Sequence, residues 1–154
     1  MTPASLQSLK TLLELAEGER DAARAALRAA EESARRAEAQ AGQLDDHRDQ
    51  YRERWMAQFR QSATATLLQC HHGFAQRLDQ AIEQQRQQCA QNDQRVTRAR
   101  QQLQAREQRV AAVRKLIERR LLALQKQADR HEQKQTDEAA QRAAWTARLA
   151  MDTL

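Results

Sequence analysis

The sequence contains few of the residues that build turns, strands and large cores. Among its 154 residues, glycine occurs 3 times, proline once, and aromatic residues make up only 3%. Tight turns depend on glycine and proline, and strands favour aromatic and β-branched residues. A β-sheet protein and an α/β enzyme are therefore excluded. Because no run of about 18 apolar residues occurs, we expect no direct membrane insertion.

Three residue types that favour helices supply about half of the chain, with 30 Ala, 24 Gln and 22 Arg. Hydrophobic residues make up 40%, and nearly half of them are alanine. That leaves too few large side chains for a globular core. The composition thus predicts an all-α protein that buries only a narrow apolar seam.

A heptad pattern covers the first 60 residues. Steps of alternately three and four residues reach apolar side chains at all but two of fifteen positions, and a repeat of this length is typical of a coiled coil. The positions are Leu6, Leu9, Leu13, Ala16, Arg20, Ala23, Leu27, Ala30, Ala34, Ala37, Ala41, Leu44, Arg48, Tyr51 and Trp55. They predict one helix over about residues 3–60.

A second seam follows a weak helix-forming stretch. We place a turn at 61–66, where Ser62, Thr64 and Thr66 can cap a following helix, and a second helix at about 67–150. A single continuous helix stays possible, because neither Gly nor Pro marks the turn. The second seam is apolar at twelve of seventeen positions: Leu68, His71, Ala75, Leu78, Ile82, Gln85, Cys89, Asn92, Val96, Ala99, Leu103, Arg106, Val110, Val113, Ile117, Arg120 and Leu124.

The second seam ends at Leu124 although residues that favour helices continue. A chain that folds back near residue 63 pairs positions whose numbers add to about 127, so Leu6 meets roughly Leu121. A parallel dimeric scaffold would give the seam no reason to end there. We therefore predict one coiled-coil domain over 1–154, an antiparallel hairpin of two long helices with a C-terminal overhang at 125–154, monomeric when free.

Charge and cysteine content indicate no chemistry of their own. The net charge of +5 arises in residues 61–124, where acidic residues interrupt the basic ones as on a solvated helix face; a nucleic-acid-binding coiled coil is the alternative.

Cys70 and Cys89 would lie ~28 Å apart on one helix, so we expect free thiols. There is no phosphate loop, catalytic triad or zinc spacing, so we expect no catalytic residue, metal or cofactor. The opening residues lack a secretory signal, which predicts a cytoplasmic protein.

Four of the five aromatic residues fall near the predicted turn. Tyr51 and Trp55 occupy seam positions, and Phe59 and Phe74 lie close to them. Phe74 is beside the seam residue Ala75 and therefore on the flank of the hairpin. A ring in that position is difficult to bury between two helices and is typical of a binding anchor.

Three stretches resemble the flagellar export protein FliJ family and its injectisome relatives in type III secretion. In the first helix, Gln40, Leu44, His47 and Tyr51 recur at spacings of four, three and four. In the second, Phe74, Leu78, Ala81 and Gln85 repeat these spacings. The late stretch EQKQTDEAAQR, residues 132–142, is similar to the family's charged terminal motif.

The resemblance implies a non-enzymatic coiled coil similar to the central stalk of rotary ATPases. Members insert their terminal end into the ring of the hexameric export ATPase and contact the cytoplasmic part of the membrane export-gate protein, and some escort or recycle export chaperones. The implied gate-binding residues are Gln40, Leu44, His47, Tyr51, Phe74, Leu78, Ala81 and Gln85. The implied ring-binding residues are Glu132, Lys134, Asp137, Glu138, Arg142 and Trp145. No nucleic acid partner is expected, the protein would associate peripherally with the inner membrane, and a flagellar apparatus is favoured over a virulence injectisome.

Overall fold

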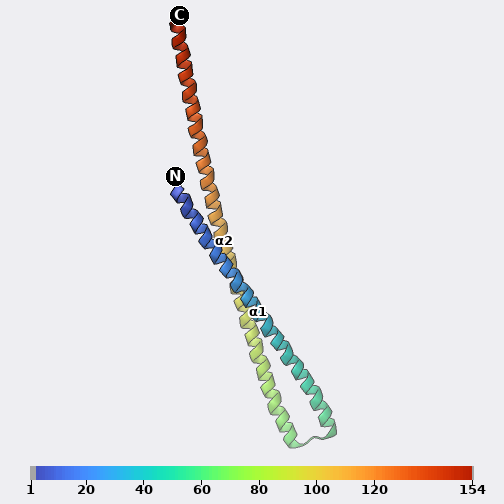
Figure 1. Cartoon of the computed structure of the whole chain (residues 1–154). Helices are drawn as coiled ribbons and strands as arrows, with labels where there is room; N and C mark the ends of the chain where they lie inside the picture. Colours follow the sequence, from blue (N-terminus) through green and yellow to red (C-terminus); the bar gives the residue numbers. More distant parts are fainter. Residues whose placement is uncertain (1–2, 154) are drawn as a thin grey trace. The chain divides into compact units, whose positions relative to one another are not determined.

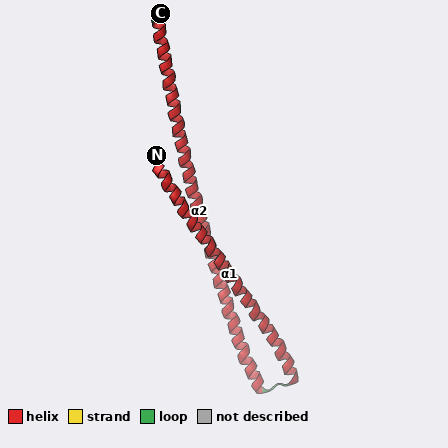
Figure 2. Cartoon of the chain, in the orientation of Figure 1, coloured by secondary structure: helices red, strands yellow, loops and turns green. Residues whose placement is uncertain are grey.

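The structure, a computed structural model, describes residues 3–153 and consists of two helices (Figure 1). Helix α1 spans Pro3–Gln61 and helix α2 spans Ala65–Asp152. The described residues include no strand (Figure 2). The predicted all-α hairpin with a longer second helix is confirmed, since α1 has 59 residues and α2 has 88. Neither helix contains a stretch long and apolar enough to span a membrane within residues 3–153.

The connection between the helices is shorter than expected. It comprises residues 62–64, because Gln61 is still helical and α2 already begins at Ala65. The Ser62 amide donates to the Gln58 carbonyl at 3.0 Å, which completes the end of α1. The Thr64 hydroxyl accepts a hydrogen bond from the Leu67 amide at 3.3 Å, as an N-cap does. Thr64 therefore caps the start of α2, and the single continuous helix is excluded.

The chain divides into two compact units. The second unit is Glu19–Glu107 and contains the turn; the first consists of residues 1–18 and 108–154. In the second unit the two helix segments lie side by side and antiparallel (Figure 1). Gln85 donates to the Ala37 carbonyl at 2.8 Å, and Arg106 pairs with Glu19 at 2.8 Å. The residue numbers of these pairs add to 122 and 125, close to the predicted 127.

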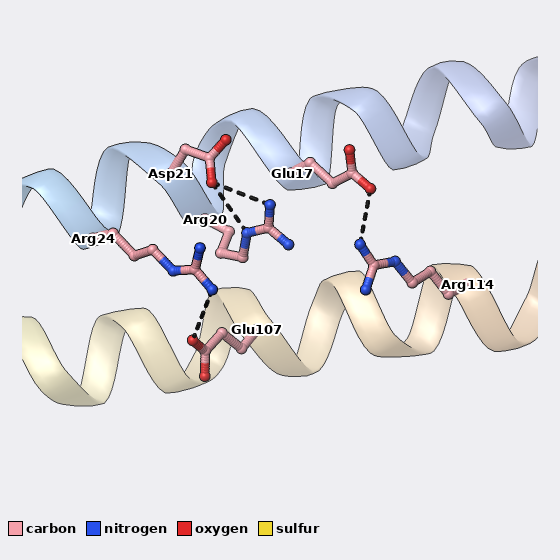
Figure 3. A network of polar contacts seen from close by, with 6 residues as sticks. All are labelled: Glu17, Arg20, Asp21, Arg24, Glu107 and Arg114. Carbon is pink, nitrogen blue, oxygen red and sulfur yellow. Dashed lines mark hydrogen bonds and ion pairs between the residues drawn. The ribbon is translucent and has the colours of Figure 1, made fainter.

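The core of the second unit is the predicted seam. Its buried side chains are Ala23, Ala37, Ile82 and Val96, all at seam positions. Polar seam residues are half-buried, and Gln85 and Arg106 bond across to α1 as described above. Flanking ion pairs join the helices as well, with Arg24 and Glu107 3.8 Å apart (Figure 3) and Arg100 and Glu31 3.7 Å apart. Each exposed pair contributes at most about 1 kcal/mol, so these contacts select the register more than they supply stability.

The first unit contains the other seam segments. Leu9, Ala16, Val110 and Val113 are buried there, and Arg114 pairs with Glu17 at 3.1 Å (Figure 3). Leu124 is half-buried, and every described side chain after it is exposed. The predicted overhang is thus a helix without an intramolecular partner over residues 125–152. The extension of one coiled-coil domain over the whole chain stays a prediction.

The antiparallel arrangement predicts a short distance between positions 20 and 107 within one molecule. We replace Cys70 and Cys89 by serine, place spin labels at these two positions, and dilute the labelled protein with unlabelled protein. Because packed helix axes lie about 8–10 Å apart, we expect a label separation of roughly 20 Å that dilution leaves unchanged. A separation of many tens of ångströms, or a signal that dilution removes, would contradict the hairpin.

The narrow core predicts unequal effects for two substitutions of large aliphatic residues. The Ile82 side chain is 5% exposed, whereas that of Leu122 is 53% exposed. We expect Ile82→Ala to lower the free energy of unfolding by about 2–3 kcal/mol through lost burial and a cavity. Leu122→Ala, the matched control, should change it by less than about 0.5 kcal/mol. Urea titration followed by circular dichroism measures both values, and equal losses would show that the seam is wrongly assigned.

Candidate partner-binding surface

An aromatic cluster occupies the turn end of the second unit. Tyr51, Trp55 and Phe59 recur every four residues on α1 and therefore lie along one side of it, facing α2. Tyr51 and Trp55 are in edge contact at 5.8 Å between ring centroids, and Trp55 and Phe59 lie 5.1 Å apart. The predicted gathering of aromatic residues near the turn is confirmed.

His71 of α2 packs among these three rings. Its centroid lies 5.5 Å from that of Tyr51, 4.5 Å from Trp55 and 5.5 Å from Phe59. The buried His71 Nδ1 has no hydrogen-bond partner among the described residues, so the imidazole acts mainly through ring contacts. His71 is a seam position by sequence, but its place at the centre of the cluster was not predicted. The available signal was its seam position opposite two aromatic seam residues.

Leu68, the first position of the predicted second seam, is not packed between the helices. Leu68 is 49% exposed although it belongs to the second seam by sequence. The rings of Trp55 and Phe59 are large enough to fill the space between the helices and contact His71 instead. The seam therefore begins at His71 rather than at Leu68.

Phe74 lies on the flank of the hairpin, as predicted, and is 43% exposed. It is not isolated, because its ring centroid is 4.2 Å from that of Tyr51. Beside these two rings the surface has a hollow of about 360 Å³. Both helices line this hollow, with Leu44, His47, Gln50, Tyr51, Arg54, Phe74 and Leu78.

Five of the eight residues expected to bind the gate lie around the hollow, and two others form a pair across the helices. Five of them line the hollow: Leu44, His47, Tyr51, Phe74 and Leu78. Gln85 donates to the Gln40 side-chain oxygen at 3.4 Å, which joins a further pair across the helices. Ala81 is half-buried one or two turns from Phe74, Leu78 and Gln85 on α2. Both helices thus contribute to the hollow and to the Gln40–Gln85 pair.

The residues expected to bind the ATPase ring lie on the overhang of the first unit. Lys134, Glu138, Arg142 and Trp145 follow one another at spacings of four, four and three, so they share a face of α2. Arg142 and Glu138 are 3.9 Å apart, and Trp145 is 64% exposed. Asp137 is next to this face, whereas Glu132, two residues before Lys134, points to the opposite side. The helix thus brings together five of the six residues.

The described residues contain no group of three or more histidine, cysteine or carboxylate side chains able to hold a metal ion. Cys70 is an exposed free thiol and Cys89 a half-buried one. The surface therefore offers shape, apolar area and charge for binding a partner.

A family model described as "Flagellar FliJ protein" matches residues 5–149. The chain belongs to the flagellar FliJ family. The match includes both seams, the hollow and most of the overhang, and this membership supports a role connected with flagellar export. A comparison with curated proteins gave no match. The family resemblance inferred from the three short stretches is thus confirmed over nearly the whole chain.

Proposed function

We propose that this FliJ-family chain is a non-enzymatic stalk that couples the export ATPase to the membrane export gate of a flagellar type III apparatus. The observation that carries the proposal is the hollow, where five of the implied gate-binding residues converge from two helices. Tyr51 and Phe74 come from positions 23 residues apart and still meet at 4.2 Å. Such a surface of partly exposed rings is typical of a binding hot spot. In this proposal the hollow contacts the cytoplasmic part of the gate protein.

The overhang is the proposed contact with the ATPase ring. Its side chains from 125 to 153 are all exposed, and Trp145, Leu149 and Met151 expose 64%, 51% and 78% of their area. An isolated helix with exposed large apolar residues gains stability when a partner covers them. Insertion into the hexameric ring would cover this helix and promote assembly and hydrolysis. In this function the chain is cytoplasmic, peripheral to the inner membrane, and able to escort or recycle export chaperones.

Stimulation of the ATPase tests the ring contact. We expect the purified chain to raise hydrolysis by the cognate export ATPase at substoichiometric amounts. Trp145→Ala should remove most of this stimulation, because an exposed Trp on the proposed binding face is lost. Leu122→Ala is the control, since Leu122 is an exposed apolar residue of the same helix that precedes the overhang. Phosphate release measures both variants, and unchanged turnover with no co-migration of wild-type chain and ATPase would contradict the ring contact.

Two aromatic substitutions test the gate contact. Phe74→Ala removes a ring from the hollow, while Phe59→Ala removes a half-buried ring that contacts Trp55 and His71 and does not line the hollow. Titration calorimetry with the cytoplasmic part of the gate protein should show binding at least about tenfold weaker for Phe74→Ala. Binding by Phe59→Ala should stay within about twofold of wild type although its melting temperature falls as much or more.

The comparison separates loss of binding from loss of stability. Phe74 contacts Tyr51, so some decrease in melting temperature accompanies Phe74→Ala as well. If binding followed the melting temperature in both variants, the aromatic cluster would serve stability alone. If neither variant affected binding, the gate contact would lie elsewhere on the chain.

A further inference from the structure

Carboxylates are absent from the surface that surrounds the hollow. In a heptad labelled a to g, with a and d in the seam, the hollow lies on the side of the g positions and the adjacent c positions. His47, Arg54 and Phe74 occupy g, and Gln50 occupies c. In residues 40–61 and 67–88, no c or g position holds Asp or Glu. All six carboxylates of these two segments are at b, e or f positions: Asp45, Asp46, Asp49, Glu53, Asp79 and Glu83.

Cationic groups remain on the same side. Arg54 lines the hollow, and Arg77 is at the c position one turn after Phe74. Neither guanidinium has a carboxylate partner among the described residues; Arg77 Nε donates only to the Gly73 carbonyl, at 3.3 Å. In the same unit, by contrast, Arg24, Arg100 and Arg106 bind carboxylates across the helices. The hollow is therefore an apolar depression beside two cations with no nearby anion on its face.

We propose that the hollow binds an apolar side chain from a partner segment whose flanking residues are aspartate or glutamate, with Arg54 and Arg77 pairing with those carboxylates. The lining of Leu44, Tyr51, Phe74 and Leu78 suits an aliphatic or aromatic anchor. Guanidinium groups bind carboxylates in a planar, forked geometry. A basic segment would meet like charge on this face. This inference rests on the proposed gate contact and specifies the chemistry of the segment that the gate contributes.

A second copy of the chain is a poorer occupant. If two hollow faces met symmetrically, each copy would present Arg54 and Arg77 to the same surface of the other copy, and neither face would supply a carboxylate. Like charges brought together at an interface cost binding free energy. The charge distribution thus favours an acidic partner over self-association through this surface.

Charge reversal at matched positions tests the inference. Arg54→Glu changes a residue that lines the hollow, while Arg60→Glu makes the same charge change at an exposed f position of the same helix. The probe is the purified cytoplasmic part of the cognate gate protein, titrated against full-length chain at low and high salt. We expect Arg54→Glu and Arg77→Glu each to weaken binding about tenfold or more at low salt, and Arg60→Glu by less than about twofold. Arg54→Lys should retain most of the affinity.

The outcomes separate this inference from the function on which it rests. If wild-type chain does not bind the gate fragment, the proposed gate contact itself fails. If Phe74→Ala abolishes binding while Arg54→Glu and Arg77→Glu bind like wild type, the contact stands and the acidic segment is wrong. Equal weakening by Arg54→Glu and Arg60→Glu would also overturn the inference, because net charge alone would then explain it. Sedimentation tests whether a second copy occupies the hollow. We expect no wild-type dimer that depends on Phe74. A dimer that Phe74→Ala dissociates would identify a second copy as the occupant.

Discussion

The structure depends on a narrow apolar seam, because each helix has only one apolar stripe to bury. No large side chain in the described residues is fully enclosed, and the buried residues are mostly alanine and valine. Such a seam buries little apolar area for each turn of helix. Because its alanine stretches resemble one another, they do not by themselves define which residues pair. Register therefore has to come from polar contacts, such as Gln85 with the Ala37 carbonyl and Arg106 with Glu19. These contacts are individually weak, yet a shifted pairing would leave half-buried polar groups without partners.

The candidate site follows from the same constraint. Between Ala16 and Ala41 most seam residues of α1 are alanine, but near the turn they become Tyr51 and Trp55. Two helices cannot enclose rings of this size on all sides, so part of the aromatic area stays on the surface. Phe74, which lies beside the seam, extends that area and forms the edge of the hollow. A local excess of side-chain volume thus converts a structural seam into a surface suited to binding.

Much of this arrangement was predictable from the sequence. The heptad steps located nearly every seam residue, and the end of the second seam at Leu124 indicated where helix pairing stops. The predicted turn was too wide: residues 62–64, rather than 61–66, separate the helices. Differences in helix propensity of a few tenths of a kcal/mol do not fix a boundary. The exposure of Leu68 and the central place of His71 depend on how particular rings fill space. The hollow required the relative register of Phe74 and Tyr51, which the sequence constrained only to within a few residues.

Helix geometry alone places four ring-binding candidates on one face, with Asp137 beside that face and Glu132 opposite. No tertiary contact alters this arrangement, because every described side chain of the overhang is exposed. The hollow differs, since both helices contribute to it. Its carboxylate-free face can be recognised only after the side chains are assigned to heptad positions and the two g positions are known to lie together.

The alanine seam also determines which changes the molecule tolerates. In a globular core the common damage is a cavity left by a smaller side chain. Ala16 is 2% exposed, but its side chain is so small that shortening it leaves almost no cavity. A leucine there would instead have to displace the backbone of the opposing helix segment, and Ala23 and Ala37 impose the same limit within their own unit. At these buried alanines the packing therefore opposes a gain of side-chain volume rather than a loss of it.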